Sequence, residues 1–124
     1  MSGVINSSCV LSVQHGSLRS NLNPGQSAIV QSVARGPSPG CVIVGTSDTA
    51  IDFSELATLG VIQVTNLDET NFVDFGPDDG VGALEPAVRI AAGETWQFRL
   101  VPGVSYLAKA DTAACAVVFS AFND

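Results

Sequence analysis

The residues best suited to chemistry in this sequence are one histidine, one serine loop and a group of acids. His15, the sole histidine, precedes Gly16 and Ser17, and a Ser-His-Asp arrangement through it is conceivable. A histidine in a turn or on the surface is far more common, and we favour that interpretation. The sequence therefore offers no catalytic histidine by pattern.

Residues 36–40 match the G-x-S-x-G pattern of a serine hydrolase nucleophile elbow. That elbow uses the backbone N–H of the residue after the serine, and Pro39 has none. The elbow must also lead into a helix, whereas residues 41–44 have the composition of a strand. We interpret residues 36–40 as a rigid loop.

Four acids, Asp74, Asp78, Asp79 and Glu85, are close enough in sequence to bind calcium through oxygen atoms. Their spacing fits no EF-hand, and a solvated loop is the favoured interpretation, so calcium binding by residues 74–85 stays open. Residues 80–82 lack the third glycine and the following helix of a phosphate-binding loop.

The three cysteines, Cys9, Cys41 and Cys115, form no CxxC pair. An odd, scattered set indicates neither a disulfide framework nor a zinc site, and we expect buried thiols in a reducing cytosol. We predict no catalytic, cofactor-binding or metal-binding residue, no cofactor, and no enzymatic activity.

The composition indicates a single domain that contacts other protein subunits. The chain has 124 residues, and 46% are hydrophobic, mostly small Val and Ala, while only 14% are charged. Soluble domains average about 25% charged residues. Some apolar surface is therefore expected to contact other subunits, in an oligomer or a larger assembly.

The net charge of −7 is unevenly distributed. No acid precedes Asp48, and only Arg19 and Arg35 are charged there; from Asp48 onward twelve acids meet three cations, a net charge of −9. This distribution argues against nucleic acid as a partner. The sequence shows no basic signal-peptide start and no apolar run near the ~18 residues of a membrane span, so we expect no membrane partner.

The elements that must position these residues are strands. Residues 60–76 are predicted to be two strands folded back on each other, with Ile62 and Val64 on one face of the first and Val73 and Phe75 on one face of the second. Residues 66–71 are predicted to form the turn between them, because Asn, Asp and Thr side chains can bond their own backbone.

Other segments show the same alternation. Residues 95–101 are predicted to be a strand whose Trp96 and Phe98 are the heaviest core anchors, and residues 84–90 an edge or bulged strand because Pro86 cannot donate. Residues 41–44 and 115–122 are apolar on both faces, which predicts central strands or strands covered by a partner. One helical turn is predicted after Ser54.

The pattern predicts an all-β fold, an antiparallel β-sandwich of jelly-roll type with about eight to ten short strands. We expect residues 1–8 to be a flexible N-terminal arm and residues 9–124 to be a single β-sandwich domain.

Several segments from residue 44 onward carry a resemblance to known proteins. In order they are VGTS at 44–47, IDF at 51–53, NLDETNFV at 66–73, RIAAGE at 89–94, FRL at 98–100 with Pro102, and YLAKADTAA at 106–114. This series, over about two thirds of the chain, resembles small β-sandwich structural proteins of tailed bacteriophage virions. None of these segments is a catalytic motif.

The resemblance implies a capsid decoration, or cement, protein that assembles in the host cytoplasm. Such a protein binds the major capsid protein as a homotrimer, with its N-terminal arm on the shell and its acidic body facing solvent. An alternative is a tail- or fibre-associated module that binds a host surface or another tail protein, which would need exposed aromatic side chains. A third alternative, a small hydrolase or cupin-like metalloenzyme, would need a histidine cluster.

Overall fold

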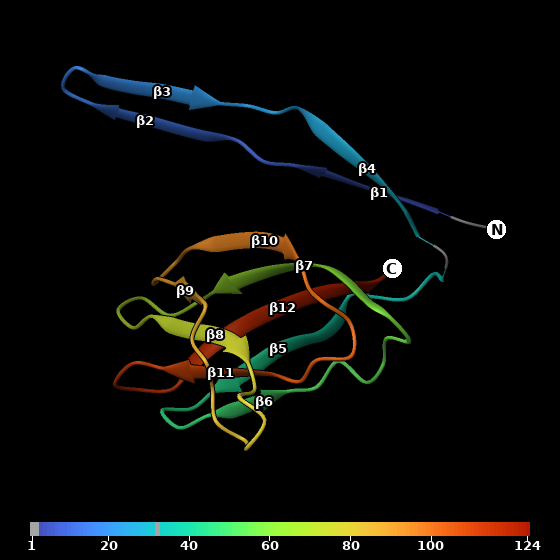
Figure 1. The fold of residues 1–124 in the computed structure, drawn as a ribbon. Coiled ribbons are helices and arrows are strands. Elements are labelled where there is room, and N and C mark those ends of the chain that lie inside the picture. The colour runs from blue at the N-terminus through green and yellow to red at the C-terminus, as the bar shows by residue number, and fades with distance from the viewer. Residues whose placement is uncertain (1–2, 32) are drawn as a thin grey trace. The chain divides into compact units, whose positions relative to one another are not determined.

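The computed structural model describes residues 3–31 and 33–124, and these contain strands and turns but no helix. The chain divides into two compact units, Met1–Ala34 and Arg35–Asp124, and each is described here by itself (Figure 1). In the described residues, four strands lie in the first unit and eight in the second, and all their pairings are antiparallel. The prediction of an antiparallel all-β protein is confirmed.

The N-terminal unit is a long two-stranded ribbon. Strand β1 (Gly3–Ser8) pairs with β4 (Gln26–Gln31), and β2 (Leu11–His15) pairs with β3 (Leu18–Leu22). The chain reverses at Gly16, whose φ of 57° lies in the left-handed region that favours glycine. We call these four strands the ribbon, and β2 with β3 the distal hairpin.

The boundary between the units differs from the predicted one. Residues 3–8 of the expected flexible arm are strand β1, and strands β2 to β4 pair within the ribbon rather than with the sandwich. No described residue of the ribbon is buried. No aromatic residue precedes Phe53, so the ribbon lacks the aromatic side chains on which the core of the sandwich is centred.

The C-terminal unit contains two four-stranded sheets. The first sheet has the strand order β10-β7-β12-β5, and the second has the order β6-β11-β8-β9. The strands are β5 (Ser38–Val44), β6 (Thr49–Ile51), β7 (Leu59–Asn66), β8 (Val73–Pro77), β9 (Val88–Ile90), β10 (Thr95–Arg99), β11 (Tyr106–Ala110) and β12 (Cys115–Asn123). A β-sandwich-like arrangement results, as predicted.

The strand pairing in this unit is nested. Strand β8 pairs with β9, β7 with β10, β6 with β11, and β5 with β12. The first four strands therefore pair with the last four in reverse order, as in one long hairpin that has been folded over. Strands β8 and β9 are the one consecutive pair that shares a sheet.

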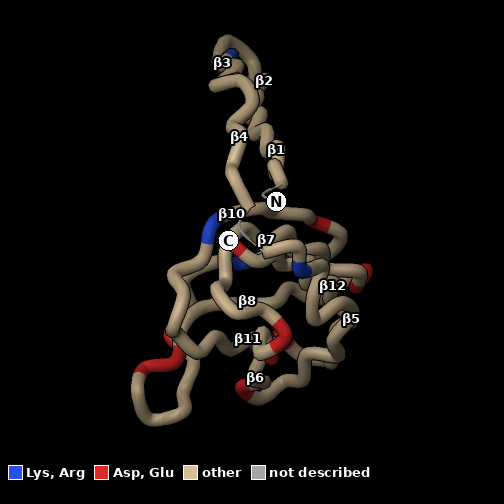
Figure 2. The backbone as a smooth tube through the Cα atoms, turned by 90° about the vertical axis from the view of Figure 1, so that its right-hand side faces the viewer, with Lys and Arg blue, Asp and Glu red and all other residues tan. Residues whose placement is uncertain are grey.

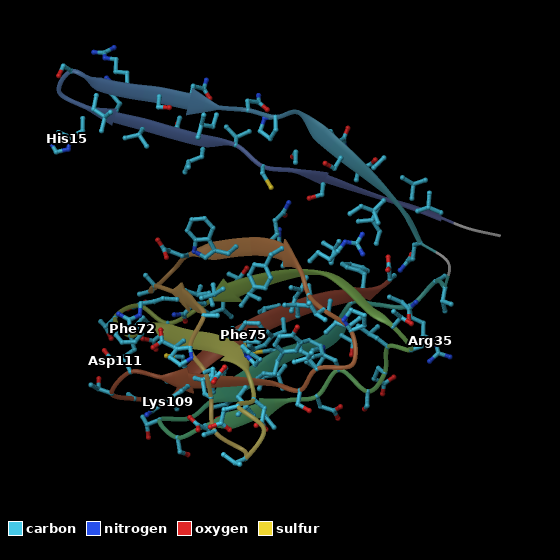
Figure 3. The ribbon with its side chains drawn as sticks, in the orientation of Figure 1. His15, Arg35, Phe72, Phe75, Lys109 and Asp111 are labelled. Carbon is cyan, nitrogen blue, oxygen red and sulfur yellow. The ribbon has the colours of Figure 1, made fainter. Side chains whose placement is uncertain are left out.

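The core lies between the two sheets and is centred on aromatic rings. Phe75 of β8 stacks on Tyr106 with ring centroids 5.5 Å apart and lies 5.8 Å from the ring of Phe119 on β12. Figure 3 shows Phe75 in the interior of the sandwich. Further buried aliphatic side chains come from both sheets, among them Val44, Ile62, Val64, Val73, Ile90 and Val117.

The predicted hairpin over residues 60–76 is wrong, although its alternation is right. Ile62, Val64, Val73 and Phe75 are all buried. However, β7 and β8 lie in different sheets and do not pair with each other, so residues 67–72 cross from one sheet to the other. Alternation reports which side chains face the core, but it carries no information about which strand is the neighbour.

The side-chain-to-backbone hydrogen bonds predicted for residues 66–71 are present, although the segment crosses between the sheets instead of closing a hairpin. Asn66 is buried, and its Nδ2 donates to the carbonyl oxygens of Asn71 (2.9 Å) and Ile90 (3.2 Å). The Asp68 carboxylate accepts the backbone N–H groups of Asn71 (2.7 Å) and Thr70 (3.1 Å). These two donors, Asn71 first, lower the pKa of Asp68.

Trp96 is not the core anchor we predicted. It lies opposite Val64 on the core-facing side of β10, but β10 is an edge strand and 45% of the side chain is exposed. Its Nε1 donates to Oε1 of Glu94 at 3.3 Å. Phe98, two residues on, packs partly buried against the core as expected.

Three further segments differ from the prediction in part. Residues 41–44 belong to an edge strand, β5, with Ile43 exposed, whereas the doubly apolar β12 is central, one of its two predicted alternatives. Only Val88–Ile90 of the predicted strand 84–90 is regular, and it is an edge strand as Pro86 indicated. Residues 54–57 form a turn rather than a helical turn, closed by the Leu56 N–H to the Phe53 carbonyl at 3.0 Å.

Candidate interaction surfaces

The residues of a conceivable Ser-His-Asp arrangement lie in different units. His15 ends β2 in the ribbon, where it is exposed (Figure 3). Every Asp and Glu of the chain lies in the C-terminal unit. The prediction that His15 is a turn or surface histidine is confirmed.

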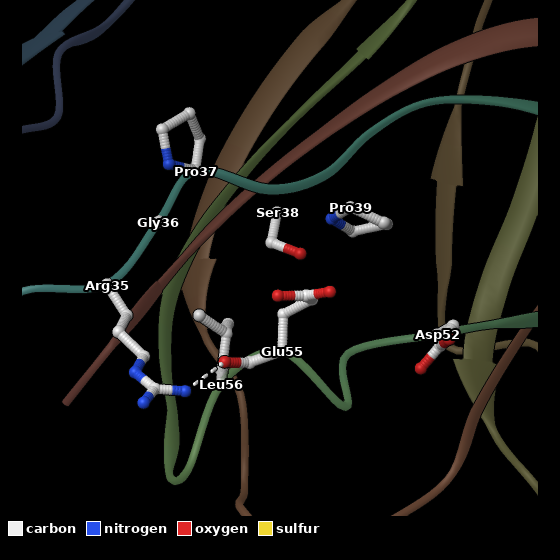
Figure 4. Close-up of a pocket in the computed structure, with 8 residues that line it drawn as sticks. All are labelled: Arg35, Gly36, Pro37, Ser38, Pro39, Asp52, Glu55 and Leu56. Atoms are coloured by element: carbon white, nitrogen blue, oxygen red, sulfur yellow. Dashed lines mark hydrogen bonds between the residues drawn. The ribbon is translucent and has the colours of Figure 1, made fainter.

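Ser38 of the G-x-S-x-G match lies at the first position of β5 and pairs with Ala121 of β12. It lines a pocket of about 590 Å³ together with Arg35, Glu55 and neighbouring residues (Figure 4). Arg35 Nη1 donates to the Glu55 carbonyl oxygen at 3.1 Å. Because the serine opens a strand and precedes a proline, the pocket lacks the oxyanion donor of a nucleophile elbow.

In the acidic loop, the carboxylates of Asp78 and Asp79 accept hydrogen bonds from the loop's own backbone N–H groups. Asp78 Oδ1 accepts the N–H groups of Gly80 (2.7 Å) and Gly82 (2.9 Å), and Asp79 Oδ1 accepts that of Val81 (2.9 Å). The Val81 bond is the larger cause of the lowered pKa of Asp79. The amides that could hold a phosphate and the carboxylates that could hold a cation thus satisfy each other. Within residues 3–31 and 33–124, no three His, Cys, Asp or Glu side chains gather as a metal site.

The cysteines only partly match the expectation of buried thiols. Cys115 is buried, and burial raises the pKa of its thiol. Cys9 and Cys41 are exposed, so for these two the expectation is wrong. Cys9 lies between β1 and β2 in the ribbon, and Cys41 lies on β5 next to Val42, which packs against the core.

The outer face of the second sheet is charged. Lys109, Asp74 and Arg89 lie in one row across β11, β8 and β9. Arg89 binds Asp74 through two hydrogen bonds of 2.8 and 3.1 Å, and its guanidinium lies 3.7 Å from the centroid of the Phe72 ring. The hydrogen bond to Asp74 raises the pKa of Arg89. Such a face is suited to solvent.

The outer face of the first sheet is uncharged over most of its width. Residues paired directly across neighbouring strands share a face, so Ile43 lies beside Ala116, and Cys41 beside Val118. Ile43 is 64% exposed. We call these four side chains, on β5 and β12, the apolar strip. Next to the strip, β7 and β10 present Thr65 to Thr95 (3.0 Å) and Gln63 to Gln97 (3.4 Å).

The distal hairpin is amphipathic. Its pairs Ser12–Asn21 and Gln14–Arg19 make one face polar. The pairs Leu11–Leu22, Val13–Ser20 and His15–Leu18 make up the other face, and its four aliphatic side chains are 40% to 60% exposed. We call Leu11, Val13, Leu18 and Leu22 the aliphatic face. A row of exposed aliphatic side chains is unfavourable for a monomer in water and is typical of a surface that contacts another protein.

The proximal part of the ribbon also exposes aliphatic side chains. Val4 of β1 and Val30 of β4 are cross-strand neighbours, and both are exposed. The ribbon contains no acid, whereas the C-terminal unit has four cations and twelve acids (Figure 2). The two units therefore offer different chemistry to a partner, one aliphatic and acid-free, the other acidic.

These surfaces had a signal in the sequence that pattern reasoning missed. The predicted sandwich domain includes residues 9–35, but all eight aromatic residues of the chain lie at or after Phe53. Aromatic side chains bury the largest area in a core. Their absence before Phe53 is the sequence feature that separates residues 9–35 from the packed sandwich.

No family model, curated protein or solved structure matches this chain. Among the described residues, no helix is long and apolar enough to cross a lipid bilayer. Function is therefore inferred from the surfaces of the two units together with the sequence resemblance described above.

Proposed function

We propose that this chain is a bacteriophage virion structural protein, a capsid decoration (cement) protein that binds the assembled head as a homotrimer. The observation that carries the proposal is the division into an acid-free ribbon with exposed aliphatic side chains and an acidic sandwich. That division fits a subunit whose task is to contact other subunits.

The nested strand pairing supports assignment of the sandwich as a jelly roll. An eight-stranded hairpin folded into two four-stranded sheets is the arrangement of jelly rolls, which occur in viral capsid proteins, lectins and cupins. A cupin-like metal site needs several histidines, and the one histidine of this chain lies in the ribbon. Metal analysis of the purified protein tests that alternative directly.

The mechanism of stabilisation is linkage. A protein that binds the assembled lattice of the major capsid protein, and not its dissociated subunits, shifts the equilibrium toward the lattice by mass action. Three attachment points in one trimer add avidity, so each need bury only a standard interface of about 800 Å² per partner. The exposed Val4 and Val30 give the proximal ribbon an apolar contact for the shell, while the acidic sandwich faces solvent.

Mass spectrometry of separated phage heads and tails tests the proposal. We expect the chain in purified heads, in a fixed ratio to the major capsid protein, and absent from tails. Its presence in tails alone would favour a tail- or fibre-associated module, an alternative that the exposed indole of Trp96 supports because aromatic side chains are common in recognition surfaces. Absence from particles would contradict both.

Deletion of Met1–Ser8 tests the role of the ribbon. The deletion removes β1, the pairing partner of β4. We expect lower occupancy on purified heads, with the unfolding transition of the sandwich unchanged because its strands begin at Ser38. Wild-type occupancy after the deletion would exclude the proximal ribbon as the attachment site.

A further inference from the structure

The aliphatic face of the distal hairpin would be stabilised by burial against another apolar surface. A two-stranded hairpin has no core of its own and is marginally stable in water. In this hairpin four aliphatic side chains share one face with Ser20 and His15, whereas the other face is wholly polar and includes Arg19. An amphipathic hairpin of this kind is stabilised when its apolar face packs on a second apolar surface.

The apolar strip has the dimensions and chemistry of that second surface. It is two strands wide, as is the hairpin, and it lies at an edge of its sheet. Neither the strip nor the aliphatic face contains a charged side chain. By contrast, the outer face of the second sheet carries Asp74, Arg89 and Lys109, whose desolvation would oppose docking of leucines there.

Charge favours contact between copies through these two surfaces. Four cations and twelve acids give each C-terminal unit a net charge of −8, so two sandwiches repel each other when acidic surfaces approach. The ribbon has no acid and a net charge of +1 from Arg19. A contact of ribbon to sandwich avoids that repulsion, and a contact of sandwich to sandwich does not.

We propose that the distal hairpin of one copy docks its aliphatic face on the apolar strip of a second copy. The contact is heterologous, because hairpin and strip are different surfaces, and a heterologous contact that closes makes a ring such as a trimer. The proposal holds whether or not the protein is a virion component.

Sedimentation of the full chain and of single variants tests the docking. Val13→Asp places a charge in the aliphatic face, and Ile43→Asp places one in the strip; the native side chains are 40% and 64% exposed, so folding should survive. We expect a wild-type oligomer and a dissociation constant raised about tenfold or more in each variant, since a buried, unpaired charge is costly. Ser12→Asp, on the polar hairpin face, and Val81→Asp, in the acidic loop, are the matched controls and should sediment as wild type.

Mixing the two variants distinguishes docking of the hairpin on the strip from other contacts between copies. The Val13→Asp copy retains an intact strip, and the Ile43→Asp copy retains an intact hairpin, so the mixture has one functional contact. We expect a one-to-one dimer that grows no further. An Ile43→Asp protein that still assembles would show that hairpins bind one another instead. A monomeric wild type, or a mixture that stays monomeric, would overturn the proposal.

Cys41 provides an independent readout because it belongs to the strip and is exposed in the single chain. We expect a maleimide to label Cys41 several-fold more slowly in the wild-type oligomer than in Val13→Asp, as located by mass spectrometry. Equal labelling rates in the two proteins would place the hairpin elsewhere and contradict the docking.

Discussion

The ribbon and the sandwich are built from similar strands but differ in what their side chains can pack against. Both alternate apolar and polar residues. In the sandwich, alternate residues such as Ile62 and Val64 are buried against the rings of Phe75 and Phe119. In the ribbon the same alternation leaves Val13 and Leu22 exposed. Alternation therefore predicts a strand, whereas burial of its apolar face depends on whether a second sheet packs against it.

The largest expected effect on this comparison comes from removing an aromatic ring at the centre of the core. Phe75→Ala deletes a fully buried side chain that contacts the rings of Phe98, Tyr106 and Phe119. We expect the free energy of unfolding of the sandwich to fall by about 3–5 kcal/mol, from lost burial and the cavity left behind. Urea denaturation followed by circular dichroism measures it.

Leu18→Ala in the ribbon is the matched control for Phe75→Ala. Leu18 is exposed and lies outside the sandwich, so its truncation should change the sandwich transition by less than about 0.5 kcal/mol. A comparable loss from both substitutions would mean that the ribbon shares a cooperative core with the sandwich, and the contrast between the units would fail.

Part of this fold was predictable from sequence. The strand class, the buried faces of β7 and β8 and the turn after Asn66 all follow from local rules of alternation and side-chain hydrogen bonding. Strand partners did not follow, because β7 pairs with β10 and β12, and β8 with β9 and β11, rather than with each other. Trp96 likewise keeps its core-facing register, but its place on an edge strand, a property of the whole sheet, leaves it exposed.

The candidate surfaces were harder to predict than the fold. The charge split and the expectation of subunit contacts came from composition. The exposed position of Cys41 and Ile43 did not, because an apolar strand such as residues 41–44 looks the same whether it is central or at an edge. Strand β5 is at the edge because no described strand other than β12 pairs with it in this sheet, which no local pattern specifies.

A smaller loss of stability is expected when a buried polar side chain is removed. Asn66→Ala removes a buried amide that donates to Asn71 and Ile90 and joins the loop at residues 67–72 to the end of β9. The two carbonyl oxygens lose a donor, so we expect a loss of about 1–3 kcal/mol in the sandwich. Leu67→Ala, at the exposed neighbouring position, should be close to neutral in the same denaturation experiment.

The smallest expected effect concerns acid, and it should be confined to the sandwich. Hydrogen bonds from backbone N–H groups lower the folded-state pKa of Asp68 and Asp79, and those from Ser54, its hydroxyl first, lower that of Asp52, each from an ordinary value of 3.8. The unfolded state then binds protons more readily, so their stabilisation is complete above that value and is lost as the pH falls through the lower folded values. Thermal unfolding should therefore be insensitive to these groups at neutral pH and shift to lower temperature below about pH 4. Replacing Asp68 with Asn should flatten that acid dependence, and an unchanged profile would mean that the Asp68 loop does not contribute to it.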